Sequence, residues 1–322
     1  MSQFARIAGT GSYLPEKVLT NDDLATLVDT SDAWIQERTG IRKRHIAENE
    51  TTGDLAEHAA RAAIESAGMK PDDIDLIVLG TTTPDRVYPA TACQLQARLG
   101  TSGYPAFDVQ AVCSGFVYAL GVAEKFVASG SAKRALVVGA DVHSKLLDWT
   151  DRGTCVLFGD GAGAVVLEAS DDPGIYSTLL RADGSCEHLL YVDGSVAEGY
   201  DNPSQSAAQV KMQGNEVFRR AVKALGEVVL ESLEANGLEK SDIDWLVPHQ
   251  ANRRIIEAMA KKLSMPMERV VMTVGEHGNT SAASVPLALD TAVRDGRIKR
   301  GDTLLLEAFG GGFTWGASLI KY

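Results

Sequence analysis

Amphipathic segments alternate with short apolar segments along the chain, and one such unit occurs twice. Residues 59–80 (AARAAIESAGMKPDDIDLIVLG) and 228–249 (VVLESLEANGLEKSDIDWLVPH) each predict an amphipathic helix, a glycine stop, an Asp-rich turn and a short buried strand. Gly68 of the first copy aligns with Gly237 of the second, an offset of 169 residues that holds across the unit. A repeat of this kind indicates a duplicated α/β architecture.

The register of the repeat extends beyond this unit. Ala119 matches Ala288 at the same offset, and the apolar run near Lys133 parallels the run near Gly301. Chance similarity between common βα units is the alternative explanation. A fixed register across several elements argues against it.

Two Gly-rich stretches, GDGAGAVVLEAS and GGGFTWGASLI, also correspond, but at a smaller offset. The first half therefore carries an extra loop, which includes residues 149–152. Neither stretch matches a phosphate-binding loop, so both are expected to allow close backbone packing. The repeat breaks at residues 170–174. We expect two α/β halves, residues 1–172 and 173–322, packed about a pseudo-two-fold axis with functional sites where they meet.

Composition and charge narrow the class of protein. The 322 residues are 45% hydrophobic and 23% charged, which is ordinary for a globular protein. The formal net charge of −12 disfavours nucleic acid and anionic membranes as partners. The sequence shows neither a start that resembles a signal peptide nor an apolar run long enough to span a membrane. We therefore expect a cytoplasmic protein.

The cysteines form no CxxC pair, so no zinc or other metal site is expected, and in a reducing cytosol they should be free thiols. Cys113 differs from the others because FDVQAVCSGF passes from a strand or loop into a helix at this residue. A helix N-terminus favours a thiolate and leaves backbone N–H groups available to an oxyanion. From position alone, a cysteine packed against the sheet is an equally good interpretation.

Two further polar residues occupy related places in the second half. His249 follows the buried strand WLVP and opens a loop, where an imidazole can donate hydrogen bonds or move protons. Asn279 opens another helical run and lies close to position 282, the repeat equivalent of Cys113. The alternatives are a structural histidine and a helix N-cap. Pseudo-symmetry would bring Cys113, His249 and Asn279 to one interface, and His277 is a reserve candidate.

The motifs around these residues resemble those of a known family. AVCSGF, VPHQANRRII and GNTSAASVPLAL are similar to the three catalytic motifs of β-ketoacyl-ACP synthase III, in the thiolase superfamily. TSDAWIQERTGIRKRHIA and DRGTCVLFGDGAGAVVLEAS add to the likeness, which spans essentially the whole chain. The resemblance implies a duplicated, five-layered αβαβα fold and a homodimer. It also implies decarboxylative condensation of an acyl-CoA, acetyl-CoA by default, with malonyl-ACP, without a cofactor.

The resemblance also implies residue roles. Cys113 would carry the acyl group, His249 and Asn279 would bind the thioester carbonyl of malonyl-ACP, and the oxyanion hole would be formed by the amides of Cys113 and Gly311. Tyr88 resembles a position that closes the acyl pocket across a dimer interface. The residues implied in CoA binding are Trp34, Arg38, Arg152, Asn215, Phe218 and Asn252.

An acidic chain needs a local basic patch to bind an acidic carrier protein. Arg254, Lys261 and Lys262 share one face of a predicted helix, although charged runs on helices are usually only solvated surface. The full set expected to contact the carrier protein is Gln250, Arg253, Arg254, Lys261, Lys262 and Arg219.

Several other classes of enzyme share parts of this pattern. A papain-like hydrolase normally shows CGSCW, and a biosynthetic thiolase a second cysteine near the C-terminal Gly-rich loop, and neither occurs here. Chalcone-type polyketide synthases share the Cys-His-Asn set but are typically longer. The alternative function is a non-condensing acyltransferase or scaffold protein of the same fold. Retention of all three residues argues against a scaffold.

Overall fold

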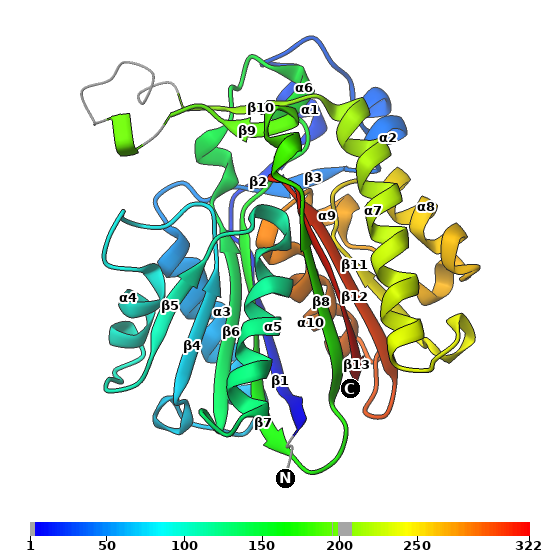
Figure 1. Ribbon diagram of the computed structural model, residues 1–322. Helices are drawn as coiled ribbons and strands as arrows, with labels where there is room; N and C mark the ends of the chain where they lie inside the picture. The colour runs from blue at the N-terminus through cyan, green and yellow to red at the C-terminus, as the bar shows by residue number, and fades with distance from the viewer. Residues whose placement is uncertain (1–3, 195, 199–207) are drawn as a thin grey trace.

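Two β-sheets face each other, with helices between them and on both outer sides (Figure 1). The computed structural model describes residues 4–194, 196–198 and 208–322. The first sheet contains, in spatial order, β1 (Phe4–Tyr13), β7 (Gly161–Ser170), β6 (Arg134–Asp141), β4 (Leu76–Gly80) and β5 (Ala106–Val109). The second contains β11 (Trp245–Pro248), β12 (Thr303–Gly310), β13 (Thr314–Lys321) and β8 (Ile175–Ala182).

Three helical layers complete the fold, as Figure 1 shows. The central layer packs against both sheets and consists of α5 (Gly115–Ala128) and α10 (Ser284–Arg294). The outer layers are α3 (Thr52–Ser66) with α4 (Thr91–Arg98) on the first sheet, and α7 (Gly214–Ala235) with α8 (Arg253–Leu263) on the second. The order of layers is αβαβα, and the predicted fold is confirmed.

The two sheets have matching topology. Reading from β1, the order β1-β7-β6-β4 corresponds to β8-β13-β12-β11. In both sheets the last two of these strands are parallel and the other neighbours antiparallel. The strand β6 begins at Arg134 and β12 at Thr303, 169 residues later. The counterpart of β5 is reduced to one parallel bridge, between Leu246 and Val270.

The chain passes from the first sheet to the second where the repeat breaks. β7 ends at Ser170 and β8 begins at Ile175. The division into residues 1–172 and 173–322 itself stays a prediction. The extra loop lies between β6 and β7 and contains η3 (His143–Leu146) and α6 (Arg152–Cys155), whereas β12 and β13 are joined by a short turn.

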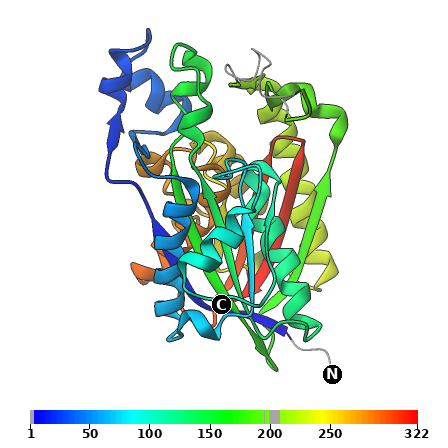
Figure 2. The ribbon, with the colours of Figure 1, turned by 90° about the vertical axis from the view of Figure 1, so that its left-hand side faces the viewer.

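The shorter elements gather at one end of the sheets (Figures 1 and 2). They are β2 (Val18–Thr20), α1 (Asn21–Ala25), α2 (Asp32–Thr39), β3 (Lys43–His45), α6, β9 (Leu190–Val192), β10 (Val210–Met212) and α9 (Val274–His277). In the part of the chain that is described, no helix combines the length and apolar character needed to cross a membrane.

Packing explains why α5 is apolar on most of its surface whereas α7 is amphipathic. α5 lies between the sheets, and its buried residues include Phe116, Val117, Leu120 and Val127. α7 lies outside and buries one stripe, so its other face remains polar. Similarly, all five residues of β4 are buried, as expected for a strand covered by helices on both faces.

Candidate active site

One cavity of about 190 Å³ contains all three members of the predicted Cys-His-Asn set. It lies between the two halves of the fold and receives residues from α2, α7, β12 and the loops after β5, β11 and α9. Its other walls are largely apolar, including Leu157, Phe158, Val217, Phe218, Leu225, Ile255 and Phe309.

Cys113 lies in η2 (Val112–Ser114), immediately before α5, and only 4% of it is exposed. The preceding Val112 has a φ of 48°, a left-handed conformation that costs a β-branched residue about 1–3 kcal/mol. This sharp turn places the thiol in the cavity. Burial raises the pKa of Cys113 to about 12, and it opposes the thiolate-favouring effect expected of the helix N-terminus. The resting nucleophile is therefore a thiol.

His249 follows β11 and is held on both sides. Its backbone N–H donates to the carbonyl of Glu307 at 2.8 Å, and its Nδ1 lies 2.5 Å from Oγ of Ser284. Burial lowers the pKa of His249 to about 3, so the imidazole is neutral at neutral pH. The Ser284 oxygen already accepts the backbone N–H of Gln250, so its own proton is free to bind Nδ1. The imidazole proton then resides on Nε2.

Asn279 is fixed through its backbone to the extra loop of the first half. Its N–H donates to the carbonyl of Leu157 at 2.9 Å, and its carbonyl accepts from Gly159 at 3.0 Å. Its side-chain Oδ1 accepts the N–H of Ser281 at 2.9 Å, so it caps a turn and is not the N-cap of α10, which is Ala283. Because Oδ1 is engaged, the side-chain Nδ2 is the group left to donate into the cavity.

The Gly-rich turn after β12 lies against the nucleophile. A Cβ on Gly310 would be 2.7 Å from the backbone nitrogen of Cys113, so only glycine permits this approach. Gly311 is buried next to it. The amides of Cys113 and Gly311 are thus on adjoining segments, as an oxyanion hole requires, although their joint role remains a proposal.

Glu307 is a cavity residue that sequence reasoning missed. It lies on β12 and its side chain is fully buried. Burial raises the pKa of its carboxyl to about 8. The available signal was one acidic residue in the otherwise apolar strand TLLLEAFG. Ser284 was missed as well, and a serine inside a helical run gives no comparable signal.

The residues expected to bind the nucleotide end of CoA form one cluster, of which Arg38 lines the cavity. The Cζ atoms of Arg38 and Arg152 lie 5.6 Å and 4.8 Å from the ring centroid of Trp34. Arg152 also donates to the carbonyl of Asp29 at 2.8 Å. Two guanidinium groups over an indole suit an aromatic base and its phosphates.

Of the remaining residues expected to contact CoA, two line the cavity and one does not. Phe218 and Asn252 line the cavity. Asn252 is also the N-cap of α8, and its Oδ1 accepts from Ile255 N–H at 3.0 Å. Asn215, at the start of α7, is exposed and does not line the cavity, although its neighbour Gly214 does.

The expectation that Gln250 contacts a carrier protein is wrong. Only 1% of Gln250 is exposed, and its amide satisfies four backbone groups. Nε2 donates to the carbonyls of Pro248 and Val271, and Oε1 accepts from Thr273 and Val274. This side chain joins the loop after β11 to the segment before α9 and cannot reach a partner.

The basic residues of this set lie on α7 and α8. Arg253, Arg254, Lys261 and Arg219 are exposed, whereas Lys262 is half-buried against α7. Arg253 pairs with Glu257 and Arg219 with Glu216, so both charges are partly neutralised. The Cζ of Arg254 lies 5.4 Å from the ring of Phe218, which lines the cavity.

A second, more open cavity of about 820 Å³ is bordered by the segment just before the nucleophile. Its walls include Gln110, Val112, His143, Leu190 and Val87. Tyr88 is 84% exposed and does not line either cavity within its own chain.

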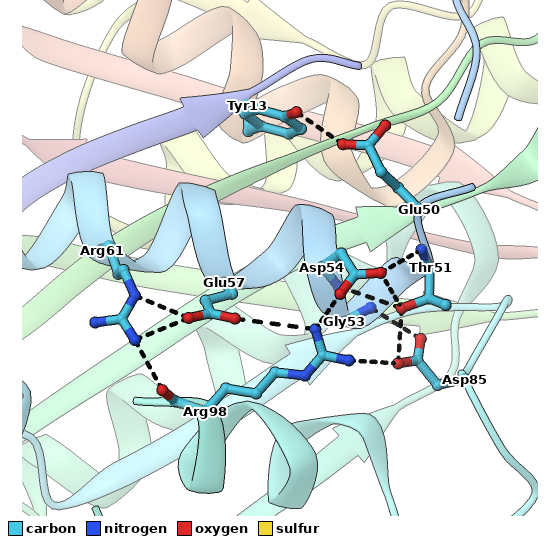
Figure 3. Close-up of polar contacts among 9 residues, drawn as sticks. All are labelled: Tyr13, Glu50, Thr51, Gly53, Asp54, Glu57, Arg61, Asp85 and Arg98. Carbon is cyan, nitrogen blue, oxygen red and sulfur yellow. Dashed lines mark hydrogen bonds and ion pairs between the residues drawn. The ribbon is translucent and has the colours of Figure 1, made fainter. Parts of the chain in front are cut away.

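The loop that carries Val87 and Tyr88 is anchored by a polar network (Figure 3). Arg98 pairs with Asp54 at 2.5 Å and with Asp85 at 3.4 Å. Asp85 also accepts the backbone N–H of Gly53 at 2.8 Å. The network ties this loop to α3 and α4, which leaves Tyr88 projecting from a fixed base.

Two other predictions can be placed. His277 is half-buried, with its ring 6.5 Å from that of His45, and it does not line the cavity. Among the described residues, no group of histidine, cysteine or acidic side chains is arranged to hold a metal ion.

A duplicated αβαβα fold with cysteine, histidine and asparagine in one interfacial cavity defines a condensing enzyme of the thiolase-like class. Residues 107–184 match the family described as "3-Oxoacyl-[acyl-carrier-protein (ACP)] synthase III", and residues 233–322 match its C-terminal part. A protein named "Beta-ketoacyl-[acyl-carrier-protein] synthase III" from Xanthomonas campestris pv. campestris is 64% identical over 320 residues, covering 99% of this chain and 98% of that protein. One of the same name from Thioalkalivibrio sulfidiphilus is 63% identical, with 99% of each covered. The chain belongs to the β-ketoacyl-ACP synthase III family.

Solved structures agree with this assignment. The 3-oxoacyl-[acyl-carrier-protein] synthase III of Aquifex aeolicus has a TM-score of 0.93 and 48% identity, covering 99% of this chain and 100% of that one. The priming β-ketosynthase of the R1128 polyketide pathway has a TM-score of 0.95 and 38% identity, with 99% and 96% covered. The chain is accordingly an acyl-transferring condensing enzyme of fatty acid synthesis.

Proposed function

We propose that this enzyme joins the acyl group of an acyl-CoA, acetyl-CoA by default, to malonyl-ACP, giving 3-oxoacyl-ACP, CoA and CO₂. The observation that carries the proposal is that Cys113, His249 and Asn279 line one cavity, and that Arg38, which also lines it, belongs to a cluster suited to a nucleotide. Each of the three residues has a chemically distinct role in a two-step reaction.

In the first step the sulfur of Cys113 attacks the thioester carbonyl of acyl-CoA. The amides of Cys113 and Gly311 stabilise the oxyanion that forms on the carbonyl oxygen. The S–C bond of the CoA thioester then breaks. The thiol proton of Cys113 leaves with the CoA sulfur, so no net charge remains in this buried site.

In the second step malonyl-ACP replaces CoA. Nε2–H of His249 and Nδ2–H of Asn279 donate to its thioester carbonyl, and this stabilises the enolate formed as CO₂ departs. Both donors are held in place by hydrogen bonds at their other ends. His249 is bonded through Nδ1 to Ser284, and Asn279 accepts the N–H of Ser281 through Oδ1. The enolate carbon attacks the acyl carbonyl on Cys113.

The substrates enter past α2, α6, α7 and α8. Trp34, Arg38 and Arg152 bind the nucleotide of CoA, while Phe218 and Asn252 contact its pantetheine arm. The basic surface for ACP consists of Arg253, Arg254, Lys261, Lys262 and Arg219. Gln250 is not part of this surface.

A homodimer accounts best for Tyr88. A side chain that is 84% exposed on an anchored loop fits a role in the acyl pocket of a partner subunit rather than its own. Neither nucleic acid nor a membrane is proposed as a partner, because of the net charge of −12. We place the enzyme in the cytoplasm.

An assay of purified enzyme with a panel of acyl-CoAs and malonyl-ACP tests the proposal. We expect 3-oxoacyl-ACP and one CoA per product, with acetyl-CoA the preferred starter. Release of free fatty acid or acyl exchange without carbon–carbon bond formation would contradict it, and the latter result would favour a non-condensing acyltransferase.

A further inference from the structure

A carboxyl group that the proposed reaction does not use forms part of the catalytic cavity. Glu307 is 0% exposed, and neither of its carboxyl oxygens has a hydrogen-bond partner among the described residues. Buried polar groups in proteins are nearly always paired, and leaving one unpaired is costly. An unpaired acid in the wall of a reaction cavity therefore indicates a function.

The surroundings keep this acid neutral. The ionisable side chains that share its cavity are Arg38, Cys113 and His249. On the neighbouring strands, the residues paired with Glu307 are Pro248 of β11 and Ala317 of β13, and α7 contributes only apolar side chains and Gly214 to the cavity. With no cation paired to it, burial raises the pKa of Glu307 to about 8.

The second step of the proposed reaction consumes a proton. The bond between the malonyl carboxylate and its methylene carbon breaks, and its electron pair forms the new carbon–carbon bond to the acyl carbonyl. When the tetrahedral intermediate collapses, the C–S bond to Cys113 breaks and the electron pair passes to sulfur. Burial makes a thiolate there unfavourable, so the sulfur needs a proton as it leaves.

His249 is poorly suited to supply that proton. It is neutral, and its single Nε2 proton is hydrogen-bonded to the substrate carbonyl in the proposed mechanism. Giving that proton away would produce an imidazole anion. The Asn279 amide is not an acid. A separate acid in the cavity would supply this proton without charging either residue.

We propose that Glu307 is the acid that protonates the sulfur of Cys113 during condensation. The O–H bond of the Glu307 carboxyl breaks, the S–H bond of Cys113 forms, and solvent returns a proton to the carboxylate before the next cycle. This inference rests on the proposed two-step function. It assigns Glu307 to the second step alone, because acylation transfers a proton from Cys113 to CoA with no net uptake.

The test compares Glu307→Gln, which keeps size and polarity but has no acidic proton, with Glu124→Gln. Glu124 is a buried carboxyl residue on α5 that pairs with Lys125 and does not line the cavity, so it controls for the loss of a buried carboxylate outside the site. Acylation of the enzyme by acetyl-CoA and condensation of the isolated acetyl-enzyme with malonyl-ACP are timed separately in single turnovers. We expect E307Q to acylate within about twofold of wild type and to condense at least about 100-fold more slowly. E124Q should match wild type in both steps.

The pH dependence supplies a second readout. The protonated form of Glu307 is the active one, so the wild-type condensation rate should fall as the pH rises through about 8. In E307Q this fall should be absent. Equal slowing of both steps, wild-type condensation by E307Q, or the same fall in both enzymes would overturn the assignment. If wild type forms no acetyl-enzyme, the proposed function itself fails, which is a different outcome. Should E307Q not fold, the wild-type pH profile alone decides.

Discussion

Oγ of Ser284 lies 2.5 Å from Nδ1 of His249 and accepts the backbone N–H of Gln250. This relationship fixes the tautomer of a neutral imidazole, because the hydroxyl proton has Nδ1 as its acceptor. The central α10 thereby controls which nitrogen of His249 donates into the cavity. The helix carries no group that needs to touch the substrate.

Ser284→Ala tests this control. Without the hydroxyl, both tautomers of His249 become accessible and the donor on Nε2 is no longer enforced. We expect the decarboxylation of malonyl-ACP to slow about tenfold, equivalent to about 1.4 kcal/mol in the barrier. Acylation of Cys113 by acetyl-CoA, followed by mass spectrometry, should change less than about twofold. Equal loss in both steps would indicate a general packing defect instead.

Asn279→Asp separates the two ends of one side chain. An aspartate keeps the oxygen that accepts the N–H of Ser281, but it replaces the donor Nδ2 with a second oxygen. A negative oxygen facing the developing enolate should slow CO₂ release from malonyl-ACP by about 100-fold to 1,000-fold. The circular dichroism spectrum should be unchanged. Near-normal CO₂ release would show that Asn279 does not bind the thioester carbonyl.

Lys261→Glu tests the carrier-protein surface without disturbing the cavity, since Lys261 is exposed and does not line it. We expect the KM for malonyl-ACP to rise about threefold to tenfold at low salt, and the effect to shrink as salt screens the charges. The KM for acetyl-CoA should not change. Lys133→Glu is the control, because Lys133 is exposed, precedes the first residue of β6 and does not line the cavity.

Arg254→Glu should behave differently from Lys261→Glu. The Arg254 guanidinium lies over Phe218, a cavity residue, so reversal should raise the KM for both substrates. An unchanged KM for malonyl-ACP in both variants would remove α8 from the docking surface.

The repeat in the sequence predicts the scaffold because its physical cause is local. Each copy forms the same helix, turn and buried strand, so both copies keep the same spacing of apolar residues. Val112 and Ser281, 169 residues apart, even share a left-handed φ of 48° and 51°. By that register the partner of Cys113 is Ala282, and Asn279 reaches the cavity because its backbone is bonded to the extra loop at Leu157.

The residues that sequence reasoning misplaced depend on contacts between distant segments. Gln250 stands beside His249 in the sequence and before a basic helix, yet its amide is used entirely by backbone groups around residues 248–274. Glu307 shows the reverse case. Its significance lies in having no partner, and the absence of a partner becomes visible only when the surrounding side chains are in place.

The most direct measurement is peptide mapping of the enzyme after brief incubation with acetyl-CoA alone. The account predicts one acetyl group per chain on Cys113, none on Cys93, Cys155 or Cys186, and release of that acetyl group as 3-oxobutanoyl-ACP when malonyl-ACP is added. Acetylation at another residue, or a Cys113→Ala variant that still forms the 3-oxoacyl product, would contradict the claim that this buried thiol carries the chain.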